Sequence, residues 1–233
     1  MSKARNNIDF LLQKPIAHRG LHNVAKNIPE NSFAAFKAAI IKGYPIELDL
    51  HLLKDGNIAV FHDDNLARLT GLDKNIKDCA LVDLPKLKDH SKIPTLQQVL
   101  DLVAGKIPIL IEFKTDAPKY ALERAALPIL QNYQGAFAIQ SFSPHSLHFF
   151  KKNAPTIPRG QLISQTPHQN TILARYVFKH LDNCYTRPDF IAVSTKRLPL
   201  NTELPILAWT IRDQQSAHQA ATCANNLICE QIL

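Results

Sequence analysis

The chain has 233 residues, 45% of them hydrophobic, so it can bury the core of one sizeable domain. Its net charge of +7 suits an anionic substrate, but no like-charge block, aromatic-rich basic repeat or zinc-finger spacing indicates nucleic-acid binding. No apolar run predicts a signal peptide or membrane span, and the four scattered cysteines indicate reduced thiols, so we expect a cytoplasmic protein.

Short apolar runs alternate with helical patterns along the chain. Strands are predicted over residues 15–18, 45–50, 107–113, 136–142, 159–164, 189–194, 205–210 and 226–230. Helices are predicted over residues 31–42, 95–104, 118–132, 144–153, 168–181 and 213–225. Continuously apolar strands separated by helices indicate an α/β fold with a parallel sheet. Eight such strands favour a closed TIM (β/α)8-type barrel, and an open doubly wound sheet is the alternative.

The segment from 51 to 106 interrupts this rhythm. It contains a hairpin signal, then a polar stretch from Thr70 to Asn75 and short leucine-bearing pieces. We interpret it as a small hairpin-plus-helix insertion after the second strand. The insertion would lie on the active-site face of a single barrel domain that spans residues 1–233.

The hairpin carries the most informative residues. Asp55-Gly56 lies between two apolar runs, which is a strong signal for a tight turn. Folding about this dipeptide pairs residues whose numbers sum to about 111, so Asp49 is expected to face His62. Glu47 and Asp49 lie two apart on one strand, so their carboxylates point the same way. Two carboxylates and an imidazole in one small volume suit a divalent cation and a proton-transfer group.

Charged residues also follow two other predicted strands. His18 and Arg19 end the first strand, and Glu112 and Lys114 end the third. In a parallel barrel these strand ends form the active-site face. Singly, each residue has a structural interpretation: His18 as a capped strand end, Glu112 and Lys114 as a surface ion pair. Arg19 could equally be a structural residue paired with Glu30.

Taken in chain order, several motifs resemble those of the glycerophosphodiester phosphodiesterase family. They are AHRG (17–20), PENS (29–32), ELD (47–49), KDG (54–56), FHDDNLARLTG (61–71), IPTLQQVL (93–100), IEFK (111–114), SF (141–142) and AWTIRD (208–213). The series from AHRG to HDD is highly specific, although no single motif would be. The resemblance nearly spans the chain and implies the family's barrel fold and metal-dependent hydrolysis.

Carried over residue by residue, the resemblance implies three groups of site residues. The implied metal ligands are Glu47, Asp49 and Glu112. The implied acid–base pair is His18 and His62. The implied substrate contacts are Arg19, Lys114, Glu30, Asn31 and Trp209. Three carboxylates suit one Mg²⁺ or Ca²⁺ ion far better than zinc, and Arg and Lys suit a phosphodiester anion.

Two positions depart from the family's pattern. Its strand-seven motif usually ends in a neutral Asn, where this chain has Arg212. Its last strand usually ends in Thr-Asp, where this chain has Cys229-Glu230. An arginine that faces the cavity would add a positive charge near the mouth and alter substrate preference.

The resemblance implies hydrolysis of a small-molecule glycerophosphodiester to sn-glycerol 3-phosphate and an alcohol. One alternative is a lysophospholipase-D-like activity on the same barrel, with aromatic and aliphatic residues of the insertion forming an acyl groove. A different class is a catalytically silent barrel that binds phosphoesters. Loss of a ligand or a histidine would mark that class, and the sequence retains them all.

Overall fold

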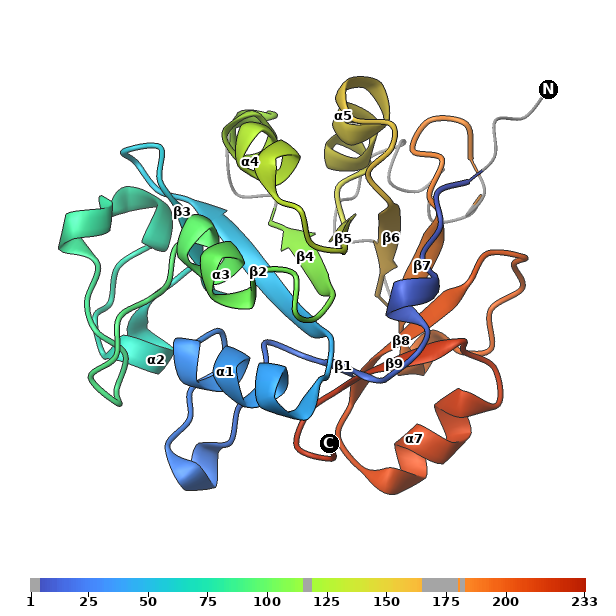
Figure 1. Ribbon diagram of the computed structural model, residues 1–233, viewed down its shortest axis with the longest axis horizontal. Coiled ribbons are helices and arrows are strands. Elements are labelled where there is room, and N and C mark those ends of the chain that lie inside the picture. Colours follow the sequence, from blue (N-terminus) through green and yellow to red (C-terminus); the bar gives the residue numbers. More distant parts are fainter. Residues whose placement is uncertain (1–4, 115–118, 165–179, 181–182) are drawn as a thin grey trace.

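The computed structural model describes residues 5–114, 119–164, 180 and 183–233. There, a ring of parallel strands is surrounded by helices (Figure 1). The strands of the ring are β1 Ile16–Ala17, β2 Ile46–Leu52, β4 Ile109–Phe113, β5 Phe137–Ser141, β6 Arg159–Ile163, β7 Phe190–Ser194, β8 Ile206–Ile211 and β9 Asn226–Cys229. β1 pairs with both β9 and β2, which closes the ring. The predicted TIM-type barrel is therefore confirmed.

The helices form the outer layer. They are α1 Phe33–Lys42, α2 Ala67–Thr70, α3 Leu96–Val103, α4 Ala121–Asn132, α5 Pro144–Asn153 and α7 Gln214–Ala221. Four of them begin at a side chain that accepts a backbone N–H of the first turn, namely Ser32, Thr95, Ser143 and Asp213. The helix predicted over 168–181 falls almost wholly outside the described residues.

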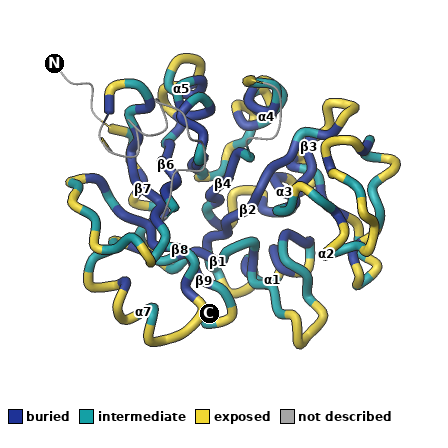
Figure 2. Tube along the Cα trace, turned by 180° about the vertical axis from the view of Figure 1, so that it is seen from behind, coloured by how far each residue is buried: buried dark blue, intermediate teal, exposed yellow. Residues whose placement is uncertain are grey.

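Successive side chains of a strand point alternately into and out of the barrel, and both sets are buried. Leu110 and Phe190 pack into a cluster inside the barrel, whereas Ile109 and Ile111 pack outward in a second cluster with helix residues such as Phe36. Figure 2 shows the result as buried strands at the centre, with exposed segments confined to loops and outer helix faces. Burial on both sides explains why the strands read as continuous apolar runs.

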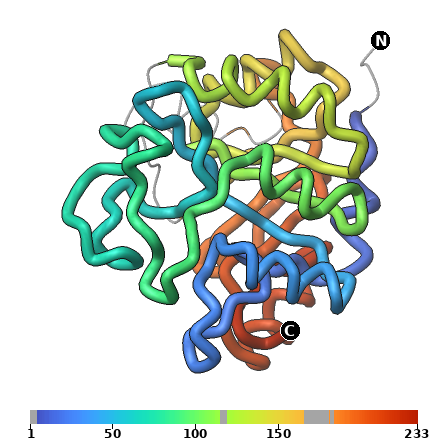
Figure 3. Tube along the Cα trace, turned by 60° about the vertical axis from the view of Figure 1, so that its left-hand side comes forward, coloured from blue at the N-terminus to red at the C-terminus, as the bar shows by residue number. Residues whose placement is uncertain are grey.

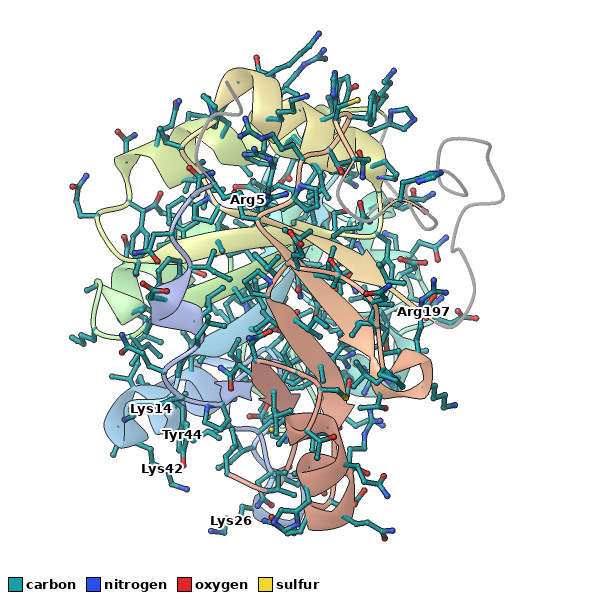
Figure 4. All side chains as sticks on the ribbon, turned by 90° about the vertical axis from the view of Figure 1, so that its right-hand side faces the viewer. Arg5, Lys14, Lys26, Lys42, Tyr44 and Arg197 are labelled. Atoms are coloured by element: carbon teal, nitrogen blue, oxygen red, sulfur yellow. The ribbon has the colours of Figure 1, made fainter. Side chains whose placement is uncertain are left out.

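The N-terminal segment closes the amino end of the barrel. Ile8 and Leu11 join the inner apolar cluster, and Asn226 Nδ2 donates to the carbonyl oxygens of Leu11 at 2.5 Å and Lys14 at 2.6 Å. Lys14 also lies over the ring of Tyr44, and Figure 4 shows the two side chains next to each other. Strands β1 and β9, from opposite ends of the chain, lie side by side (Figure 3).

The hairpin forms, but with a different register from the prediction. Strand β3 Ile58–Val60 runs antiparallel to β2, with Leu50 opposite Val60. The amide of Phe61 donates to the carbonyl of Asp49 over 3.0 Å. Asp49 therefore faces Phe61 and not His62, so the predicted pairing was wrong by one residue.

The turn explains this shift. Leu53 N donates to Asn57 O over 2.8 Å, which leaves a three-residue loop instead of the two-residue turn assumed from Asp55-Gly56. Gly56 has φ of +84°, a left-handed conformation that glycine adopts at little cost. The numbers of paired residues therefore sum to 110 instead of 111.

The segment after the hairpin has its own small apolar cluster. Its members include Phe61, Leu66, Ile76, Leu87 and Ile93, all buried. These side chains pack against one another beside the barrel. Whether residues 51–106 form one insertion in a single domain stays a prediction, as does the cytoplasmic location. Among the described helices, none has the length and apolarity needed to cross a bilayer.

Candidate active site

A cavity of about 890 Å³ opens at the carboxyl ends of the strands. Seven residues predicted from the sequence line its wall, namely His18, Arg19, Glu47, His62, Glu112, Lys114 and Trp209. They come from β2, β4 and β8, from the residues directly after β1 and β4, and from the loop after β3. The barrel therefore brings together residues that lie up to 191 positions apart in the chain.

Three carboxylates cluster at this site, and two of them, Glu47 and Glu112, line the cavity. Glu47 and Asp49 lie on β2, and Glu112 lies opposite Asp49 on the neighbouring strand β4. All three are buried, and one oxygen from each lies within 4.8 Å of the other two. Two amides hold them in place, because Gln140 Nε2 donates to Glu47 at 3.3 Å and Asn31 Nδ2 donates to Asp49 at 2.9 Å.

Two cations partly neutralise the carboxylates. Lys114 Nζ lies 2.8 Å from Asp49 Oδ1 and 2.7 Å from Glu112 Oε1. Arg19 Nε lies 3.5 Å from Asp49 Oδ2. Burial alone would raise the pKa of Asp49, but these two cations hold it well below its usual value.

Burial and the remaining negative charge raise the pKa values of the other two carboxyl groups. Burial and the neighbouring carboxylates Asp49 and Glu112 raise the pKa of Glu47 well above its usual value. Burial also raises the pKa of Glu112 despite its contact with Lys114. Three buried oxygen donors, with two cations beside them among the described residues, fit a divalent metal ion, whose charge would lower both pKa values.

His18 is held by a carboxylate that the sequence analysis did not assign to the site. Strands β1 and β9 pair Ala17 with Cys229, so the next residues, His18 and Glu230, follow at the same level. His18 Nδ1 lies 2.5 Å from Glu230 Oε1, and Nε2 lies 3.8 Å from Glu47 Oε2. Burial lowers the pKa of His18 and outweighs the hydrogen bond to Glu230.

His62 has a similar arrangement in the loop after β3. Its Nδ1 lies 2.7 Å from Asp63 Oδ1, and Asp63 accepts from Arg68 Nε at 2.5 Å. Burial lowers the pKa of His62, against the opposing effect of Asp49. Asp63 and Arg68 belong to the FHDDNLARLTG motif, but no residue spacing indicated that they support the histidine.

Arg19 sits in a turn shaped by close packing. It has φ of 56° and precedes Gly20, where a Cβ would lie 2.9 Å from the Ala35 Cβ of α1. Arg19 Nη1 donates to Glu30 Oε1 at 2.6 Å, and Glu30 also accepts from Arg68 at 2.6 Å. Glu30 thus contacts Arg19, as Asn31 contacts Asp49. The substrate contacts predicted for Glu30 and Asn31 stay predictions.

Three apolar side chains form one part of the cavity wall. They are Phe142, Leu162 and Trp209, and the rings of Phe142 and Trp209 meet edge to face with centroids 5.9 Å apart. Trp209 Nε1 is buried and has no hydrogen-bond partner among the described residues. The predicted substrate contact of Trp209 thus has a free donor available, and it stays a prediction.

Comparison with known proteins places this arrangement in a family. Residues 18–224 match the model of the glycerophosphoryl diester phosphodiesterase family. The chain belongs to this family. A glycerophosphodiester phosphodiesterase of Caldanaerobacter subterraneus is 37% identical over 161 residues, which cover 63% of this chain and 65% of that relative. Lysophospholipase D GDPD1 of Homo sapiens is 44% identical over 122 residues, covering 45% of this chain and 37% of that relative.

A solved structure agrees on the fold of this phosphodiesterase-family chain. An Oleispira antarctica phosphodiesterase in complex with the product sn-glycerol-3-phosphate superposes with a TM-score of 0.77 at 22% identity. The superposition covers 93% of this chain and 92% of that one. The likeness supports the barrel architecture from β1 to β9.

Proposed function

We propose that this protein hydrolyses glycerophosphodiesters to sn-glycerol 3-phosphate and an alcohol, in a reaction that depends on one divalent cation, Mg²⁺ or Ca²⁺. Membership of the family supports a phosphodiesterase reaction. The single observation that carries the proposal is the cluster of three buried carboxylates with oxygens within 4.8 Å of one another, two of which line the cavity together with two histidines.

Glu47, Asp49 and Glu112 are the residues proposed to hold the cation. When bound, the cation would polarise a phosphoryl oxygen and activate an oxygen nucleophile for attack on phosphorus. Arg19 and Lys114 line the same cavity and carry positive charge, so they offset negative charge that builds on the phosphoryl oxygens. Arg19 offers a planar fork, whereas Lys114 offers a point charge.

The two histidines divide the proton transfers. The glycerol hydroxyl next to the phosphate attacks phosphorus, and one imidazole takes its proton. The other imidazole gives a proton to the leaving alcohol as its P–O bond breaks, which leaves a cyclic phosphate. Water then opens the ring with the two roles reversed. The pKa values of both histidines are lowered by burial, which favours the neutral form that a base needs near neutral pH.

A substrate panel tests the proposal. The purified protein is incubated with glycerophosphodiesters of different alcohols, with Mg²⁺, with Ca²⁺ or with a chelator, and release of sn-glycerol 3-phosphate is measured. We expect release that stops with the chelator and returns when the cation is restored. Release that is indifferent to chelation would contradict the cation, and no release from any substrate would contradict the reaction.

A lysophospholipase-D-like activity is the second candidate. The observation in its favour is the apolar wall of Phe142, Leu162 and Trp209, which could contact an acyl chain. The insertion itself contributes His62, Asp63 and Asp64 to the cavity, while its buried apolar residues pack in two clusters of the core. Lysophospholipids in the same panel decide between the two activities, because only this one releases lysophosphatidic acid.

A further inference from the structure

Two charged residues at the ends of neighbouring strands lie in contact with each other. Arg212 follows β8, and Glu230 follows the neighbouring strand β9. The amide of Glu230 donates to the carbonyl of Ile211 over 2.7 Å, which brings the two side chains to one level. Arg212 Nε then donates to Glu230 Oε2 over 2.7 Å, although the residues are 18 positions apart.

The other oxygen of Glu230 contacts a proposed catalytic residue. Its Oε1 lies 2.5 Å from His18 Nδ1. A neutral imidazole has a single N–H, and a carboxylate can only accept, so this contact fixes the proton on Nδ1. The lone pair of Nε2 then faces the cavity, on the side where Glu47 lies 3.8 Å away. An imidazole in this orientation can accept a proton from a hydroxyl group in the cavity.

We propose that Glu230 is a positioning residue that fixes the ring and tautomer of His18, and that Arg212 holds Glu230 in place. The proposal rests on the proposed hydrolase function for its kinetic test. Arg212 lines the cavity but directs Nε to Glu230, so its role differs from that of a free positive charge at the mouth. Arg212 and Glu230 therefore act as a pair.

Lys196 provides a charge-matched comparison. It lines the same cavity, is exposed, and forms no ion pair with any of the described residues. A positive charge that only attracts an anionic substrate would act mainly on KM, and Lys196→Gln would show this effect as clearly as Arg212→Gln. A charge that holds Glu230 would act on kcat, and Lys196→Gln would leave kcat unchanged.

Kinetics of four variants test the pair. Partners that orient a site residue from behind typically contribute about 10–100-fold, so we expect Glu230→Leu to lower kcat by that factor with little change in KM. Glu230→Gln keeps an acceptor oxygen and should recover part of the loss. Arg212→Gln should lower kcat less than Glu230→Leu does. The double variant Arg212→Gln/Glu230→Leu should be no worse than Glu230→Leu alone, because Arg212 acts through Glu230.

The tautomer of His18 gives a readout that does not depend on activity. Nitrogen-15 NMR of the imidazoles, assigned with His18→Ala, should show His18 protonated on Nδ1 in the native protein. Glu230→Leu should lose this preference and Glu230→Gln should keep it in part, with thermal unfolding measured to confirm that both variants fold. If the native protein hydrolyses no substrate, the proposed function fails while this measurement still tests the positioning.

Three results would overturn the proposal. One is native kcat in Glu230→Leu. Another is an unchanged His18 tautomer in that variant. The third is an Arg212→Gln variant that raises KM as Lys196→Gln does while kcat stays native.

Discussion

Arg19 Nη1 donates to Glu30 Oε1 over 2.6 Å, so the proposed phosphate contact is anchored by a neighbouring carboxylate. Glu30 also accepts a hydrogen bond from Arg68. Arg68 in turn donates to Asp63, which contacts His62. Arg19 is therefore connected to the loop that carries a proposed catalytic histidine.

Because of this contact, we expect Arg19→Lys to lower activity although the charge is kept. Lysine keeps the charge but not the planar fork that reaches Glu30 and a phosphate at once. Hydrogen bonds to charged groups contribute about 1.5–3 kcal/mol, so we expect kcat/KM to fall by about 10–100-fold. Arg124→Lys on the outer helix α4 is the matched control. Near-normal kcat/KM with unchanged inhibition by inorganic phosphate would assign Arg19 a structural role alone.

The carboxylate cluster predicts cation dependence that single substitutions remove. Glu47→Gln or Asp49→Asn each delete one anionic oxygen donor, so we expect loss of cation-stimulated turnover and of Ca²⁺ or Mg²⁺ binding by calorimetry. The control is Glu123→Gln, a buried carboxyl on α4 that accepts from Ser146 outside the cavity. Full, chelator-sensitive turnover in either site variant would contradict the assignment.

The two histidines should matter for turnover and not for cation binding. General acid–base catalysis is typically worth about 10²–10⁴-fold, and we expect a loss of that size for His18→Ala and for His62→Ala. Calorimetry should show native cation affinity in both variants. His145→Ala on α5 is the histidine control. A variant that loses cation binding together with turnover would point to a metal ligand instead of a proton-transfer group.

Removal of the Lys114 side chain should change the affinities for cations and for anions in opposite directions. Its ammonium lies 2.8 Å from Asp49 and 2.7 Å from Glu112, and these contacts raise its pKa, so it stays charged near neutral pH. Lys114→Ala leaves the carboxylates more negative, and we expect tighter cation binding, weaker binding of phosphate or sulfate, and lower turnover. Calorimetry measures both affinities. Parallel changes in the two affinities would show that the lysine only stabilises the local fold.

The N-terminal segment should contribute to stability through its place beneath the barrel. Leu11 is fully buried in the inner cluster. Truncation of a buried leucine typically costs about 2–5 kcal/mol, so we expect Leu11→Ala to lower the free energy of unfolding in urea by that amount. Val82→Ala, at a side chain that is 90% exposed, should change it little. Equal stability of the two variants would show that the segment does not plug the barrel.

Much of the fold is readable from local sequence. Each predicted strand overlaps an observed one, because strands buried on both faces leave continuous apolar runs. The common side of Glu47 and Asp49 follows from the two-residue period of a strand, and it holds in the barrel. The register of the hairpin does not follow in this way, because it depends on the conformation that Gly56 adopts in the loop.

The pairings of Arg19 with Glu30 and of Glu112 with Lys114 were open to prediction from the sequence, but the partners of His18 and Arg212 were decided by tertiary structure alone. Glu230 reaches His18 from the other end of the chain because β9 closes the barrel beside β1. The sequence left open whether Arg212 faces the cavity, and strand pairing sets its guanidinium against Glu230. A sequence specifies which residues end a strand through local patterning. Long-range pairing sets which strand lies next to it in the closed ring. It therefore also sets the carboxylate that His18 and Arg212 meet.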